Sequence, residues 1–139
     1  MKNYKQINHE NHLIAIIINN KSISKGINFY TKPNNAFQIG IHLQDKGTKL
    51  LPHSHNIPKP LSIKSIQEVL YVVKGKIKVT LYTLKGEKIS AHILKVGESI
   101  LLISGGHGVE FLENSKVYEV KQGPYPGVRK AKEYFRGDK

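Results

Sequence analysis

Short stretches in which apolar residues alternate with polar ones, or follow one another as β-branched runs, recur along most of this chain. The clearest is 76–82, in which Ile77, Val79 and Leu81 alternate with lysine, threonine and tyrosine. Because successive side chains of a strand point to opposite faces, this period of two predicts strands with one buried face. The predicted strands are 13–18, 37–43, 68–73, 76–82, 89–94, 99–103, 107–111 and 117–120.

Glycine-containing turns separate these segments, for example at Gly75, Gly86 and Gly97. Many short strands joined by tight turns are typical of an all-β sandwich or barrel. A single helix is predicted, over 128–135, and because it is short we expect it to dock on the outside of the β-structure. The polar residues 1–12 are predicted to form an N-terminal arm, and 13–139 one domain.

Composition narrows the class of protein. The 139 residues include no cysteine, which excludes disulfides and thiolate metal ligands. The net charge is +12, but the lysines are scattered and no nucleic-acid-binding motif accompanies them. We therefore expect solvated lysines or an anionic small-molecule ligand rather than nucleic acid. The longest apolar run, 13–18, is far shorter than the roughly 20 residues of a membrane helix, so a cytoplasmic location is expected.

Two histidines stand one residue apart in the segment 47–55. In an extended chain His53 and His55 project to the same side. Two imidazoles in that arrangement can bind one metal ion through nitrogen. Each histidine alone is more often an ordinary polar residue than a metal ligand. The pair therefore indicates a metal site only if further candidate ligands are present.

Glu68 and His107 are those further candidates. Glu68 lies at the start of a predicted strand, where two registers are open. In one register it faces the core with Leu70 and Val72, and a carboxylate there needs a partner or a metal. In the other register it is solvated. His107 follows the glycines 105–106, and a histidine on an apolar strand face is either a satisfied core residue or a ligand.

The residues from 47 to 114 resemble the two sequence motifs of the cupin superfamily. The first motif is similar to Gly47-(five residues)-His53-x-His55 followed by Glu68-(six residues)-Gly75, and the second to Gly97 followed by Gly105, Gly106 and His107. The gap 56–67 has 12 residues where the family commonly has three or four. The second motif lacks the expected proline, and its glycine-to-histidine spacing is one residue shorter.

The resemblance implies a single-domain jelly-roll barrel that holds a divalent metal ion on His53, His55, Glu68 and His107. Iron, manganese, nickel, cobalt and zinc all suit such ligands. An ion with open positions can polarise a carbonyl, acidify water or bind substrate and oxygen. The implied function is an isomerase- or dioxygenase-like reaction on a sugar, sugar nucleotide or carboxylate. The alternative is a non-catalytic carbohydrate or small-molecule binding or sensor module. A homodimer without a membrane partner is also expected.

Five residues are candidates for contacting the substrate: His42, Tyr71, Lys121, Gln122 and Tyr125. The segment 121–125 offers a cation, an amide and a phenol directly after a predicted strand. The alternative interpretation is a plain turn for that segment, a solvated side chain for His42 and a half-buried packing residue for Tyr71.

Overall fold

The computed structural model describes residues 3–19, 21, 23–56, 64–124, 126–127 and 132–135. Every regular element in this part of the chain is a β-strand, which confirms the all-β prediction. The strands are β1 (Tyr4–His9), β2 (His12–Asn19), β3 (Gly26–Phe29), β4 (Gly40–Leu43), β5 (Glu68–Lys74), β6 (Lys76–Tyr82), β7 (Lys88–Lys95), β8 (Glu98–Leu102), β9 (Gly106–Phe111) and β10 (Lys116–Lys121). The described residues contain no helix that could cross a membrane.

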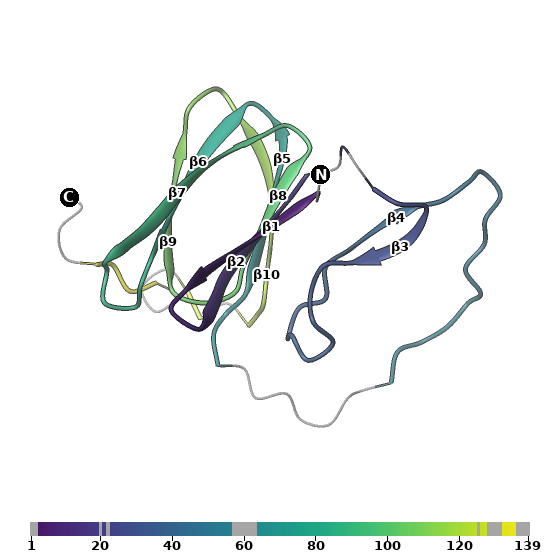
Figure 1. Cartoon of the computed structure of the whole chain (residues 1–139), viewed down its shortest axis with the longest axis horizontal. Helices are drawn as coiled ribbons and strands as arrows, with labels where there is room; N and C mark the ends of the chain where they lie inside the picture. Colours follow the sequence, from purple (N-terminus) through teal and green to yellow (C-terminus); the bar gives the residue numbers. More distant parts are fainter. Residues whose placement is uncertain are drawn as a thin grey trace.

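Two antiparallel sheets face each other (Figure 1). One has five strands in the order β1-β2-β8-β5-β10, and the other has three in the order β7-β6-β9. Strand β6 shows why the two sheets pack face to face. Its apolar residues alternate with polar ones, and Ile77, Val79 and Leu81 are fully buried between the sheets. From the five-stranded sheet Val72 and Ile100 complete this core. Each such side chain contributes roughly 1.5–3 kcal/mol when it leaves water.

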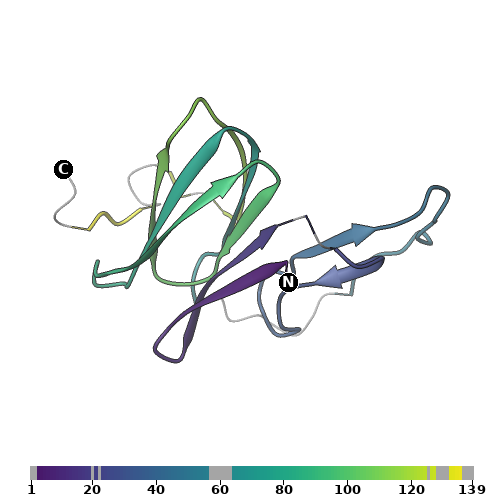
Figure 2. The same ribbon diagram turned by 45° about the horizontal axis from the view of Figure 1, so that its top comes forward.

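A third layer, the hairpin β3–β4, covers part of the outer face of the five-stranded sheet (Figure 2). This outer face presents Ile16 and Ile18 of β2 and Leu101 of β8, all buried. The residues packed against them from the hairpin and its turn are Tyr30, Phe37, Ile39 and Ile41. Strand β2 is therefore apolar on both faces, and this explains its unbroken apolar run.

The two facing sheets do not close into a barrel within the described residues. Closure requires hydrogen bonding all the way round, and β9 and β10 each pair with one neighbour only. Val109 and Phe111 share the inner face of β9 with the core but remain 37% and 61% exposed along this open side. The segment 44–56, predicted to carry part of the barrel, is exposed and forms no strand.

The ends of the chain also differ from the sequence predictions. Residues 4–9, within the predicted arm 1–12, form β1 and pair with β2. The predicted helix 128–135 is absent over 132–135, and 128–131 lie outside the described residues. A helix of two turns does not persist without extensive docking. Within 132–135, Phe135 contacts the sandwich at Tyr82, Gly86 and Gly106.

We expect Gly75→Ala to destabilise the protein much more than Gly47→Ala. Both glycines have a positive φ, of +81° and +88°, so both substitutions strain the backbone. At Gly75 an added Cβ would also lie 2.8 Å from the carbonyl oxygen of Asn114 and the Cα of Ser115, whereas at Gly47 it meets nothing. Urea denaturation should show a loss of about 1 kcal/mol for Gly47→Ala and at least twice that for Gly75→Ala. Equal losses would contradict this packing.

Candidate functional site

Glu68 and His107 meet at one end of the sandwich. Glu68 is the first residue of β5 in the five-stranded sheet, and His107 lies at the start of β9 in the facing sheet. The registers place Glu68 opposite Leu102, and His107 opposite Leu81, so both come from the same end of the two sheets. Glu68 Oε1 lies 3.4 Å from His107 Nε2. This pair therefore bridges the two layers directly.

The burial of β5 decides between the two registers that the sequence left open. Glu68, Leu70 and Val72 are all buried, and the intervening residues face the other side. The carboxylate thus stands on the core-facing side, in the register that requires a partner. Only 11% of the Glu68 side chain is exposed against 33% of that of His107. The pair is therefore closed on the carboxylate side and open to solvent on the imidazole side.

The charges around Glu68 favour its ionised form. Burial by itself raises the pKa of Glu68, because it penalises the charged carboxylate. The hydrogen bond and charge of His107, together with the charges of Lys121 and Lys132, outweigh this effect. The pKa of Glu68 consequently lies below its ordinary value of 4.5. The site thus holds a negative, metal-competent carboxylate at neutral pH.

Hydrogen bonds of the preceding residue, Gln67, fix the start of β5. Its backbone N–H donates to Gln122 Oε1 at 2.8 Å, and its carbonyl accepts the N–H of Gln122 at 3.2 Å. Its side-chain oxygen accepts from Asn35 Nδ2 at 3.0 Å and from the N–H of Phe37 at 3.2 Å. Gln67 is itself buried. It therefore ties the hairpin turn and the end of β10 to the strand that carries Glu68.

The structure brings two of the five predicted substrate residues to this end of the sandwich. Lys121 stands opposite Glu68 in the β10–β5 register and pairs with Glu119 at 2.8 Å. Gln122 is engaged by Gln67, as described above.

Of the other three predicted substrate residues, the two that the structure describes lie elsewhere. His42 follows Ile41 on β4, and Ile41 packs against the sandwich. Because neighbouring side chains of a strand point to opposite faces, His42 points away from the sandwich. Tyr71 lies on the outer face of β5. Tyr125 falls outside the described residues.

The other two predicted metal ligands form a pair of their own. His53 and His55 lie in the exposed segment 44–56, with ring centroids 5.1 Å apart in an edge-to-face arrangement. His53 Nδ1 lies 2.7 Å from the carbonyl oxygen of Leu51. Among the described residues no three histidine or acidic side chains come together as a metal-binding group. The four predicted ligands are therefore present as two separate pairs.

Sequence reasoning missed the contacts of Phe135 with the strands beside the Glu68–His107 pair. Phe135 contacts Gly106, the residue immediately before His107, and its ring lies 5.8 Å from that of Tyr82. The two adjacent glycines at 105 and 106 were a visible feature of the sequence. Nothing in the local pattern links them to an aromatic residue near the C-terminus.

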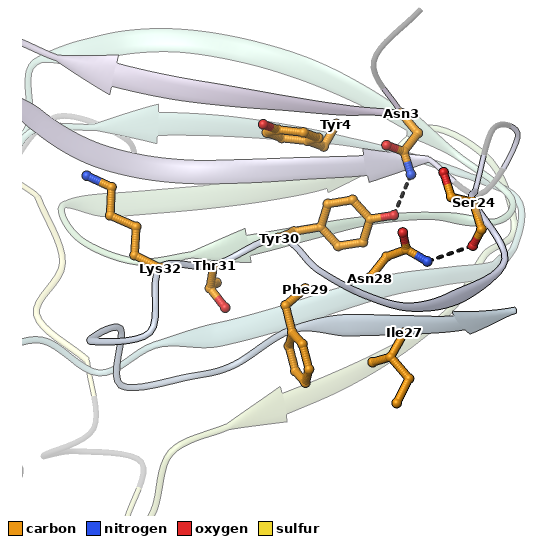
Figure 3. A pocket seen from close by; sticks show the side chains of 9 residues that line it. All are labelled: Asn3, Tyr4, Ser24, Ile27, Asn28, Phe29, Tyr30, Thr31 and Lys32. Carbon is orange, nitrogen blue, oxygen red and sulfur yellow. Dashed lines mark hydrogen bonds between the residues drawn. The ribbon is translucent and has the colours of Figure 1, made fainter.

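A separate hollow of about 530 Å³ lies between β1 and β3, beside the outer-face cluster rather than the inner face (Figure 3). The rings of Tyr4 and Tyr30 meet edge-on in it at 5.5 Å. Asn3 Nδ2 donates to the Tyr30 hydroxyl at 2.5 Å. The hollow is open and holds no acidic side chain among the residues that line it.

Comparison of the chain with protein-family models, with curated proteins and with solved structures gives no match.

The stability of the metal-free protein should depend on the ionisation of Glu68. Since its folded pKa lies below 4.5, the carboxylate stabilises the fold above that pH, and this contribution is lost as the pH falls through the folded pKa. The difference in unfolding free energy between wild type and Glu68→Gln should therefore shrink between about pH 5 and pH 3. Urea denaturation at a series of pH values measures it.

The matched control is Glu113→Gln, because Glu113 forms an exposed ion pair with Lys76. An exposed pair contributes about 0–1 kcal/mol, so this variant should track wild type over the same pH range. A pH-independent difference for Glu68→Gln would contradict the assignment.

Proposed function

We propose that this chain is a cupin that binds a divalent metal ion and acts on an oxygen-rich, anionic small molecule. The observation that carries the proposal is the meeting of Glu68 and His107. These residues belong to two different motifs of the sequence, yet they face each other at 3.4 Å on the inner side of the sandwich. A carboxylate and an imidazole so placed are ligand types shared by iron, manganese, nickel, cobalt and zinc sites.

The proposal adds His53 and His55 as the other ligands. Their rings already lie side by side, and both are exposed and therefore accessible to an ion. The 13 residue steps from His55 to Glu68 span up to roughly 43 Å when extended, so the chain allows both pairs to share one ion. The donor set of three imidazoles and one carboxylate fits a divalent metal.

When bound, the ion polarises a carbonyl or hydroxyl oxygen of the ligand and acidifies coordinated water. The residues of the chain supply the rest of the site. Glu68 holds a full negative charge, which offsets one of the two positive charges of the ion. Leu70 and Leu81, buried behind the pair, keep water from that side. Lys121 places a cation next to the carboxylate, on the side where an anionic substrate would approach. These features support an isomerase- or dioxygenase-like reaction.

One observation favours a binding or sensor module as the second candidate. The polar side chains next to Glu68 are already engaged, Lys121 with Glu119 and Gln122 with Gln67. General acid–base catalysis needs a side chain free to exchange a proton with the substrate. Among the described residues, His107 is the group at this end best suited to that role, and the proposal assigns it to the metal.

A homodimer belongs to the same proposal. Tyr118 and Val120 lie on the outer face of the edge strand β10 and are 60% and 58% exposed. An unpaired edge strand with apolar side chains is a surface on which a second copy can pack.

Metal content tests the ligand set. We expect wild type purified without chelators to carry one ion per chain by mass spectrometry. His53→Ala, His55→Ala, Glu68→Gln and His107→Ala should each weaken binding at least tenfold, because each removes a ligand. His12→Ala is the control, since His12 is an exposed histidine that pairs with His9 of β1 and is not one of the proposed ligands. Stoichiometric metal in both His53→Ala and His107→Ala would refute the site.

Turnover separates the enzyme from the binding module. The metal-loaded protein is incubated with a panel of sugars, sugar nucleotides and carboxylates, under air and under nitrogen. An oxygenase forms product only under air, and an isomerase forms it under both. The enzyme proposal predicts product with wild type and at least a hundredfold less with His107→Ala. Saturable binding of a panel member without any product would instead establish the module.

A further inference from the structure

Phe135 occupies a cradle built from three elements of the sandwich. A Cβ added at Gly106, the first residue of β9, would lie 2.4 Å from the Cε2 and Cζ atoms of Phe135. A Cβ added at Gly86, in the β6–β7 turn, would lie 3.1 Å from its Cβ and Cγ. The ring of Tyr82, at the end of β6, lies 5.8 Å away at 47°. The aromatic ring is thus held on three sides.

At position 106 the ring of Phe135, rather than the backbone conformation, excludes a side chain. Gly86 and the neighbouring Gly105 have φ values of +87° and +76°, a region that side chains disfavour. Gly106 is not among the glycines with positive φ. Its backbone therefore tolerates alanine, and the obstacle to a side chain is the ring of Phe135.

The cradle lies beside the proposed ligand site. Gly106 directly precedes His107, which contacts Glu68. Lys132 lies three residues before Phe135 in the same described segment, so the contact of Phe135 with Gly106 holds it near this end. The docked segment 132–135 thus borders the same end of the sandwich (Figure 1).

Charged side chains of both signs lie at this end. Glu68 is the buried carboxylate among the described residues, and Lys121 stands opposite it in the β10–β5 register. Lys121 is also bonded to Glu119. Among the described residues no acidic side chain forms an ion pair with Lys132, and the residue is exposed. Lys132 is therefore the cation best placed to meet an incoming anion.

We propose that residues 132–135 form a wall of the ligand site, anchored by Phe135 in the glycine cradle, and that Lys132 on this wall binds the anionic group of the ligand. The group is a phosphate or a carboxylate, since both pair with an exposed ammonium. The inference rests on the proposed function only in placing the ligand at Glu68 and His107. It adds the residue that selects a charged ligand over a neutral one.

The anchor is tested by a double-mutant cycle in the full chain. Gly106→Ala should lower the urea midpoint of wild type but leave that of Phe135→Ala unchanged, because the alanine then meets no ring. Gly108→Ala is the matched control in the same strand. A Cβ there would make an ordinary 3.7 Å contact with Tyr82, so the midpoint should stay the same in both backgrounds. An equal effect of Gly106→Ala in both backgrounds would overturn the anchor.

The anion is tested by titrating metal-free protein with inorganic phosphate, and separately with acetate, while the amide resonances of Gly106 and His107 are followed by NMR. Lys132→Gln should weaken the binding of at least one of the two about fivefold, the effect of one exposed ion pair. Phe135→Ala should weaken it similarly, because it releases the wall. Lys95→Gln removes the same charge at the other end of β7 and should match wild type. The acid that binds more tightly identifies the anionic group.

Equal affinities in wild type and Lys132→Gln, or no binding of either anion, would overturn the inference. Metal stoichiometry, measured on the same preparations, keeps the two proposals apart. Binding that depends on Lys132 in a protein that takes up no metal supports the wall and removes the metal site. Stoichiometric metal together with anion binding that does not depend on Lys132 supports the metal site and refutes the wall.

Discussion

The ionised carboxylate of Glu68 lies almost buried between two β-sheets, and the rest of this end of the molecule depends on compensating its charge. Removing an ion from water costs several kcal/mol, and the structure recovers this only with close partners. His107 reaches across from the facing sheet, and Lys121 stands beside the carboxylate on the neighbouring strand. A hydrophobic residue at 68 would avoid this cost altogether. With these partners in place the pKa of Glu68 lies below its ordinary value, so the folded protein favours the charged form.

The register of the sheets puts these groups together. Since side chains alternate with a period of two, a slip of β5 by one residue would turn Glu68 to the outer face and break its contact with His107. The hydrogen bonds of Gln67 oppose such a slip, because they join β5 to the hairpin turn at Asn35 and to Gln122 after β10. The buried side-chain amide of Gln67 thus helps to keep the neighbouring Glu68 on the inner face. Gln122, which the sequence predicts to contact substrate, also helps to hold the strand.

The sequence predicts the parts of this arrangement that are local. Alternation in 76–82 identifies β6, and the order of turns identifies the all-β class. It fails at β1 and β3, which are mostly polar or only four residues long. It leaves the register of Glu68 open, because β5 is apolar on both sides.

The second face of β5 carries Val69, which packs against the same outer-face cluster as the hairpin layer. Contacts between distant segments, such as that of Phe135 with Gly106, produce no periodic pattern in the sequence from which they could be predicted. The pairing of His53 with His55 could be predicted from their spacing, but their separation from Glu68 could not.

That separation has a physical meaning under the proposed function. Both hydrophobic clusters of the described core draw on the sheets and the hairpin, and neither includes a residue of 44–56. The described hydrophobic core therefore receives no side chain from the segment of the histidine pair. Ordering a residue costs about 1–2 kcal/mol of backbone entropy, whereas structural zinc sites provide about 10–16 kcal/mol. A metal shared by the two pairs can thus order several residues of the exposed segment. The ion would then be both the chemical centre of the site and the contact that joins its two halves.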